Sequence, residues 1–263
     1  MEESLTDLSV NGDLVLSGAN LLVQSDEGTT TSTPNGKGNV IIGYNEDEGD
    51  NLRSGSHHLV LGKFNSYSSY GGIVAGDKNV IAGTNASVLS GQENTVDGNL
   101  SVIVSDSSNA VSSINAAILG GYADVVSGSY ASVVGSENSA DGDYTAVLGG
   151  SSNEGFGEYA VVTSSSLNTA VGTYSVVAGG SSNNTAILGG SLNVASSDAA
   201  TAAGGLANYA LGNNAAVAGG WQNTASGPRS SILGGRNGTA SGEASTIYGG
   251  LDESTTTIYD YAP

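Results

Sequence analysis

A repeat of about 15 residues constrains the fold of this chain more than any other feature. Glycine doublets end at Gly205, Gly220, Gly235 and Gly250, which are equally spaced. A second glycine series lies between them at Gly212, Gly227 and Gly242, and it divides each repeat into two nearly equal halves. A fixed short period predicts a solenoid, in which each repeat is one coil stacked on the next. Helical repeats are disfavoured, since each glycine would cost about 1 kcal/mol inside a helix.

A column of side-chain amides follows the same period. Asp124 occupies one slot of this column, and Gly238 occupies the last. The spacing is interrupted by a slightly shortened step from Asp124 to Asn138 and by a much shorter coil from Asn183 to Asn193. The amides of the column are Asn79, Asn94, Asn109, Asn138, Asn153, Asn168, Asn183, Asn193, Asn208 and Asn223.

Each column of the repeat has a physical reason. A coil has the approximate form N-x-A-x-G-x-x-x-x-V-x-G-G, and we expect its Ala and Val positions to point inward. Stacked coils lie about 4.8 Å apart, so equal apolar residues form a continuous core. Asn tolerates tight corners and can hydrogen-bond to its neighbour in the ladder. Glycine meets a need for positive φ or for close backbone approach.

The composition fits a thin core made of small residues. Glycine accounts for 41 of the 263 residues, and the chain has one Trp, two Phe and no Cys. Large side chains are therefore too few to fill a thick globular core. The chain is nevertheless 38% hydrophobic and only 12% charged, which is unlike a disordered chain. Roughly twelve coils fit between Gly76 and Gly250, which gives a rod on the order of 55 Å long.

The predicted strands are apolar on both faces. Ala146-Val147-Leu148 and Ala216-Val217-Ala218 do not alternate with polar residues, as a strand with one wet face would. One face lines the core of the coil, and the other predicts contact with a second chain. A cyclic trimer would bury three such faces around one axis. A monomer with a mildly apolar outer face is the alternative.

Two coils near the C-terminus carry a resemblance to a known family. Asn223-Thr224-Ala225-Ser226-Gly227 precedes Ser231-Ile232-Leu233-Gly234-Gly235, and the pattern returns at residues 238–242 and 245–250. This pattern resembles the YadA-like head domains of trimeric autotransporter adhesins over residues 76–250. The resemblance implies a left-handed parallel β-roll, a homotrimer and adhesion to host surfaces.

Three departures from that family bear on the setting of the protein. The sequence shows no secretory signal, no heptad stalk and no C-terminal membrane anchor. Similar trimeric β-rolls occur in bacteriophage tail fibres, and a chain that starts at Met1 without an export signal fits that setting.

These observations predict an all-β fold, a left-handed parallel β-roll with coils of about 15 residues that assembles as a homotrimer. Residues 1–38 are expected to form a strand–turn–strand cap or attachment segment followed by a linker. Irregular coils with an acidic insertion follow at residues 39–75. The regular solenoid is expected over residues 76–250, with a C-terminal cap or tail at residues 251–263.

The charge excludes some partners. Six Lys and Arg stand against 25 Asp and Glu, which gives a net charge of −19. Such a surface repels nucleic acid and anionic membranes. No apolar stretch reaches the length that spans a bilayer, so we expect no direct membrane insertion.

The acidic insertion is a weak candidate for a calcium site. Asp47, Glu48 and Asp50 supply hard oxygen ligands, but their spacing is not that of a known calcium loop. A solvated loop is favoured, and no other cofactor is expected. His57 and His58 are the only histidines; a metal site there is a weak alternative to a structural role.

A tyrosine column forms a candidate contact strip. Tyr130, Tyr144, Tyr159 and Tyr174 recur with the period of the coils, apart from one slightly shortened step, so their rings can stack along the rod. Structural stacking is favoured over contact with a glycan or receptor.

The sequence favours a non-enzymatic protein. It has no Cys nucleophile, no G-x-S-x-G elbow and no phosphate-binding loop. Ice binding is also disfavoured, because Thr29–Thr31 and Thr255–Thr257 are expected to lie outside the regular coils. We expect an extracellular head of a trimeric fibre or adhesin, on a cell surface or virion fibre, that binds a surface or glycan receptor. The alternative is a structural subunit of a phage tail fibre or of a self-assembling filament.

Overall fold

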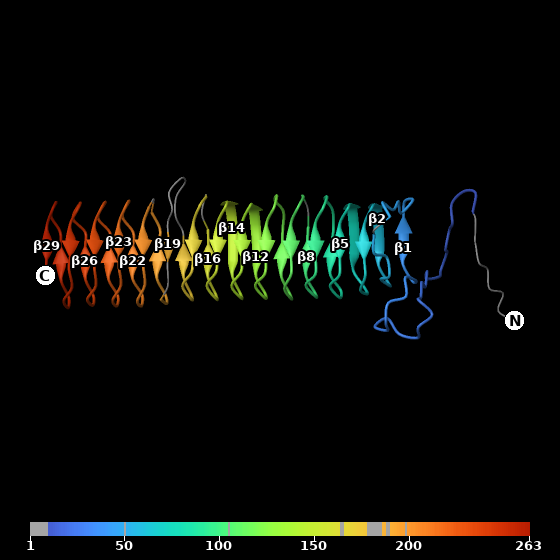
Figure 1. The fold of residues 1–263 in the computed structure, drawn as a ribbon, viewed down its shortest axis with the longest axis horizontal. Coiled ribbons are helices and arrows are strands. Elements are labelled where there is room, and N and C mark those ends of the chain that lie inside the picture. Colours follow the sequence, from blue (N-terminus) through green and yellow to red (C-terminus); the bar gives the residue numbers. More distant parts are fainter. Residues whose placement is uncertain are drawn as a thin grey trace.

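The chain forms a straight rod of stacked coils (Figure 1). The structure, a computed structural model, describes residues 10–49, 51–104, 106–163, 166–177, 186–187, 190–197 and 199–263. About 14 coils of roughly 15 residues each contribute one strand to each of two parallel sheets. This arrangement confirms the prediction of an all-β parallel β-solenoid.

The larger sheet, called sheet I here, has 15 strands. Its strands are β1 (Val40–Ile42), β2 (Leu59–Lys63), β4 (Ile73–Asp77), β6 (Ser87–Val88), β8 (Val102–Ile103), β10 (Ala117–Ile118), β12 (Ser132–Ser136), β14 (Ala146–Ser151), β16 (Val161–Val162), β18 (Val176–Val177), β20 (Val194–Ala195), β22 (Tyr209–Ala210), β24 (Thr224–Ala225), β26 (Thr239–Ala240) and β28 (Ser254–Thr255).

The other sheet, sheet II, has 14 strands. Its strands are β3 (Ser66–Tyr67), β5 (Val80–Ile81), β7 (Thr95–Val96), β9 (Ala110–Val111), β11 (Val125–Val126), β13 (Ser139–Ala140), β15 (Glu154–Gly155), β17 (Thr169–Ala170), β19 (Ala186–Ile187), β21 (Thr201–Ala202), β23 (Ala216–Val217), β25 (Ser231–Ile232), β27 (Thr246–Ile247) and β29 (Tyr261–Ala262).

Most strands are very short, with the first residue facing outward and the second inward. In β8, for example, Val102 is half-buried while Ile103 is fully buried. Successive residues of a strand point to opposite faces, so each coil adds one inward residue per sheet. Stacking places Ile103 beside Ile118 and Val88, in register. The resulting core is a narrow ribbon of Val, Ile and Ala that runs the length of the rod.

The two glycine series serve different purposes. At Gly227 the backbone has no positive φ, but an added Cβ would overlap the backbone of Gly242 in the next coil. At Gly220 the φ is +95°, and an added Cβ would also overlap the next coil. Close approach is therefore common to both series, and positive φ belongs only to the doublet series that includes Gly220. Many corner residues with positive φ are not glycine; Leu100, at +58°, is one.

Among the described strands, the two halves of the coil exchange sheets at one point along the rod. Up to β17, the half-coil that begins with the column Asn contributes its strand to sheet II. From β20, which follows Asn193, it contributes to sheet I. The switch occurs where Thr169 pairs with Ala186 and Val176 pairs with Val194, across steps longer than the usual coil. Thr173, which follows the single glycine Gly172, correspondingly forms a bridge with Ser191, which follows a glycine doublet in the sequence. We call this exchange the sheet switch.

Both ends differ from the sequence-based expectation. Among residues 10–38 the structure has no strand, whereas residues 1–38 were expected to form a strand–turn–strand segment followed by a linker. Leu14 and Leu16 are exposed there, and an isolated hairpin without a face to bury is marginal in water. Residues 1–9 lie outside the described residues. At the other end, β28 and β29 pair in register with β26 and β27, so regular coils continue beyond residue 250.

The irregular coils at residues 39–75 join the main stack. β1 pairs with β2, and β2 pairs with β4 along its whole length, so sheet I is continuous from Val40 onward. Asn35 attaches the preceding segment, because its N–H donates to Oγ of Ser56 at 3.0 Å. Among the described residues, no helix is long and apolar enough to cross a membrane.

Candidate interaction surface

The predicted amides form a buried hydrogen-bonded ladder. Along each ladder the side-chain oxygen of an Asn accepts the backbone N–H of the residue one coil further on, except at Asn168, whose Oδ1 has no hydrogen-bond partner among the described residues. Asn79 accepts from Asn94 at 2.9 Å, and Asn208 accepts from Asn223 at 3.1 Å. The side-chain Nδ2 donates to backbone carbonyls at the corners. For Asn223 these are Gly219 at 3.0 Å and Gly235 at 3.1 Å. The ladder thus pairs corner backbone groups that the sheets leave without partners.

The sheet switch divides the predicted column into two ladders. The first runs along sheet II as far as Asn168, whose N–H donates to Asn153. The second begins at Asn193 on sheet I and ends where Asn223 accepts the N–H of Gly238 at 2.8 Å. Asn183 lies outside the described residues. One member was missed: Asn65 accepts the N–H of Asn79 at 3.0 Å. Its position one coil before Asn79 was the available signal.

An aliphatic strip covers the outer face of sheet I before the switch. Leu89, Leu119 and Leu148 each follow an inward residue and are 43%, 53% and 52% exposed. They alternate along the rod with half-buried Val104 and Val134. We define these outward residues, with their strand neighbours, as the aliphatic strip; its members are Leu59, Leu61, Ile73, Leu89, Val102, Val104, Leu119, Val134, Leu148 and Val161. Contiguous exposed apolar area of this kind marks interaction surfaces.

The opposite face of the same coils is more polar. Its outward positions on sheet II include Asp97, Ser112, Ser127 and Asp141, together with the exposed apolar residues Val125, Phe156 and Val171. Over this half of the molecule, aliphatic residues are therefore aligned coil after coil on sheet I, whereas they are interrupted by polar side chains on sheet II.

Beyond the sheet switch, hydroxyl side chains lie on sheet I. Its outward positions include Thr224, Ser226, Thr239 and Ser241 as well as the exposed Tyr209 and Leu211, while sheet II presents the exposed Leu233 and Tyr248. Thr224 pairs in register with Thr239, and Thr239 with Ser254. The expectation that Thr255–Thr257 lies outside the regular coils was wrong, because Thr255 is buried within β28. Its position one coil after Ala240 was the overlooked signal.

The tyrosine column stacks ring on ring. Tyr130 and Tyr144 have centroids 5.0 Å apart, Tyr144 and Tyr159 4.8 Å, and Tyr159 and Tyr174 4.7 Å. Interplanar angles of 3° to 7° mean that neighbouring rings cover each other's faces. A sugar ring would stack on an aromatic face, and those faces are occupied. The column therefore offers ring edges and hydroxyls to a partner.

The same edge of the rod remains apolar past the switch. Leu206, Trp221 and Arg236 are bridged in register along it. The Arg236 guanidinium lies 4.1 Å from the centre of the Trp221 ring, a cation–π contact. Trp221 is consequently part of a stacked column.

Two acidic side chains of the insertion form ion pairs within the protein. Nζ of Lys78 lies 2.9 Å from Oε1 of Glu48, and Nη1 of Arg53 lies 3.6 Å from Oδ2 of Asp47. The N–H of Gly49 donates to Asp47 at 2.7 Å and lowers the pKa of that carboxyl. Asp50 lies outside the described residues. Over the part of the chain that the structure describes, no three His, Cys, Asp or Glu side chains come together as a metal site would need.

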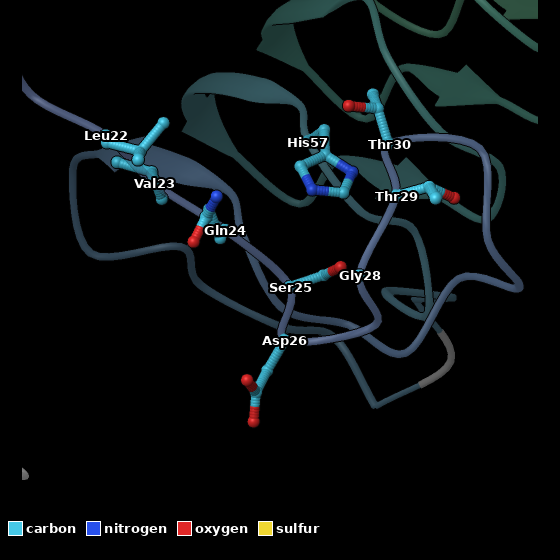
Figure 2. A pocket seen from close by; sticks show the side chains of 9 residues that line it. All are labelled: Leu22, Val23, Gln24, Ser25, Asp26, Gly28, Thr29, Thr30 and His57. Carbon is cyan, nitrogen blue, oxygen red and sulfur yellow. The ribbon is translucent and has the colours of Figure 1, made fainter.

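The two histidines have different surroundings. His58 is buried against Tyr67, with Nε2 3.1 Å from the carbonyl of Ser69, and burial lowers the pKa of its imidazole. His57 instead points into a cavity of about 320 Å³ between the first coil and the loop of residues 22–30 (Figure 2). Gln24 and Ser25 line it from the loop, while the carboxylate of Asp26 points away. Among the residues shown, His57 is the one titratable side chain directed into the cavity.

Sequence comparison agrees with the fold. Residues 69–164 match the family described as grass antifreeze beta roll. No curated protein matches the chain. Together with the stacked coils, the match identifies a β-roll repeat protein.

Proposed function

We propose that this chain is the head of a homotrimeric extracellular fibre that attaches to a surface or receptor without catalysing a reaction. In this proposal the rod is a left-handed β-roll like the heads of YadA-like adhesins or of phage tail fibres. It acts outside the cell, on a cell surface or a virion.

The observation that carries the proposal is the aliphatic strip. A soluble rod with a charge of −19 still presents aligned leucines on one face, each about half exposed. Burying a leucine side chain contributes about 1.5–3 kcal/mol, so ten aligned aliphatic residues favour association strongly. The opposite face carries Asp97, Ser112, Ser127 and Asp141 among its outward side chains, which favours contact through the side that bears the strip.

Cyclic symmetry fits a strip on one face. Each chain in a ring around an axis presents the same face inward, and closed rings of this kind are the usual form of homo-oligomers. Three rolls with sheet I toward the axis would bury the strip and leave sheet II in water. The acidic side chains of sheet II, Asp97 and Asp141, would then face outward.

An attachment assay tests the function directly. The fluorescently labelled protein would be applied to a glycan array and to panels of intact bacterial and animal cells. We expect saturable binding to a defined subset of these surfaces. Protein that is trimeric in solution and binds none of them would contradict the attachment role.

The alternative of a structural filament subunit makes a different prediction. Its coils would continue from one assembly to the next, so negative-stain microscopy would show long filaments. The attachment head predicts discrete rods of one length.

Ice binding is a second candidate, favoured by the family match and by the hydroxyl ranks beyond the switch. Thr224 and Thr239 lie in register on a sheet face, with Ser226 and Ser241 beside them. Within the matched residues, however, sheet II carries Asp97 and Asp141, whose charges hold liquid water. Inhibition of ice recrystallisation that is lost in Thr239→Tyr and kept in Ser112→Tyr would favour this function over attachment.

A further inference from the structure

Asp124 occupies an Asn position of the amide ladder. It makes the two hydrogen bonds of that position that involve the backbone N–H and the side-chain Oδ1. Its backbone N–H donates to Oδ1 of Asn109 at 2.9 Å, and its Oδ1 accepts the N–H of Asn138 at 2.8 Å. The side chain is fully buried. This residue joins the coil of β11 to the coil of β13.

The second carboxylate oxygen of Asp124, Oδ2, cannot donate a hydrogen bond as the Nδ2 of an Asn does. In the amide slots this position holds Nδ2, which donates to corner carbonyls; Asn109 donates in this way to Gly121 at 2.7 Å. Oδ2 of Asp124 has no hydrogen-bond partner among the described residues. A Cβ added to Gly121 would overlap both this oxygen and the carbonyl oxygen of Gly135, so the two oxygens lie side by side. Two acceptors that face each other in a dry interior are unfavourable unless one carries a hydrogen.

The surroundings offer no charge to neutralise an ionised carboxylate. Asn109 and Asn138, the neighbours in the ladder, are amides. Asp106, Tyr122 and Glu137, the titratable groups at this edge, are exposed. Asp106 accepts the N–H of Gly121 at 3.0 Å, and Glu137 accepts from Ser152 at 3.3 Å. Burial raises the pKa of Asp124 to about 6, against the opposing effect of its hydrogen bonds from Asn138.

We propose that Asp124 carries a proton in place of the missing amide hydrogens, so that the joint between β11 and β13 responds to pH. The protonated Oδ2 donates to the facing carbonyl and completes the ladder. Ionisation removes that donor and sets a carboxylate against the carbonyl, which loosens the joint. This device is independent of the trimer and of the attachment role.

The sign of the pH dependence follows from linkage. The pKa of the folded carboxyl, about 6, lies above its ordinary value of 3.8, so the folded chain holds the proton more tightly than the unfolded chain. The contribution to stability is therefore complete below the ordinary value and is lost as the pH rises through about 6. Acid stabilises this joint.

The test compares thermal unfolding of the full chain and of Asp124→Asn between pH 4.5 and pH 8. Background effects of the other carboxyls are common to both proteins and cancel in the difference. At pH 8 we expect the variant to melt on the order of 5 °C higher, because its amide restores the donor. At pH 4.5, which is still above the ordinary value of 3.8, most of the gap should be closed. Asp97→Asn removes an exposed carboxylate from sheet II and should show no such pH-dependent gap.

Hydrogen exchange at the Asn138 N–H locates the effect. Exchange should slow in the unmodified chain as the pH falls from 8 to 5, once the intrinsic pH dependence measured on the unfolded peptide is removed, and it should be slow throughout in Asp124→Asn. A gap in melting temperature that is constant with pH would overturn the proposal. So would a gap at pH 8 that added NaCl or CaCl₂ closes, since a cation would then fill the place of the proton.

Discussion

The side-chain oxygen of Asn79 accepts two hydrogen bonds from Asn94, one from its backbone N–H at 2.9 Å and one from Nδ2 at 3.1 Å. Nδ2 of Asn79 donates in turn to the carbonyls of Ala75 at 2.9 Å and Gly91 at 3.0 Å. One fully buried side chain therefore ties together three stretches of backbone from neighbouring coils. The rod depends on such pairing because its strands are too short to satisfy the corners.

Replacing Asn79 by alanine should destabilise the roll by about 2–4 kcal/mol, since it leaves buried donors and acceptors without partners. Chemical denaturation followed by circular dichroism measures this loss. Asn213→Ala is the matched control, because Asn213 is exposed at a corner. Equal stability of the two variants would contradict a structural role for the ladder.

Close backbone approach should require glycine at Gly227 but not at Gly219, the first residue of a glycine doublet. Gly227→Ala places a Cβ on the backbone of Gly242 and should cost about 2 kcal/mol or more. At Gly219 an added Cβ meets nothing within 4 Å and φ is not positive, so Gly219→Ala should change stability by less than about 0.5 kcal/mol. Thermal melts of both variants decide this; a similar loss in each would contradict the packing account.

The tyrosine stack should contribute to stability through its rings. Tyr144 contacts two neighbours, and each stacked pair is worth about 0.5–1.5 kcal/mol, so Tyr144→Ala should lose about 1–3 kcal/mol. Tyr144→Phe keeps the rings and should lose little. Tyr259→Ala is the control, because Tyr259 has the same φ of 57° and is exposed without a ring partner among the described residues. If Tyr259→Ala costs as much as Tyr144→Ala, the cost belongs to the corner and not to the stack.

The repeat made much of the fold predictable. Equal spacing of Gly, Asn and Val fixes which residues stack, so the coils and their inward columns follow from the sequence alone. The ladder residue Asn65 was missed because the first coils vary in length. The stacking of Tyr130 on Tyr144 was predictable for the same reason as the core.

The sheet switch could not be predicted from the columns. The prediction placed Asn183 and Asn193 in one ladder. It assumed that a coil of unusual length leaves every column in the same sheet. The departure from the common coil length instead moves each column to the other sheet, as the pairings of Thr169 with Ala186 and of Val176 with Val194 show. The apolar outer face was predicted for the whole rod, but beyond the switch the outward positions of sheet I include Thr224, Ser226, Thr239 and Ser241.

The aliphatic strip predicts where a single charge breaks the assembly. Leu119→Glu places a carboxylate at the centre of the strip and should convert trimers to monomers. Ser127→Glu adds the same charge to the neighbouring coil on sheet II and should leave the assembly intact. Light scattering after size-exclusion chromatography measures both. Dissociation by Ser127→Glu alone would place the interface on the wrong sheet.

The mass of the unmodified protein in solution tests the central claim most directly. Each chain has a mass of 25.9 kDa, and native mass spectrometry at micromolar concentration should show three chains per particle. A particle of one chain that remains soluble would mean that the exposed leucines of sheet I need no partner chain, and it would contradict the proposed trimeric head.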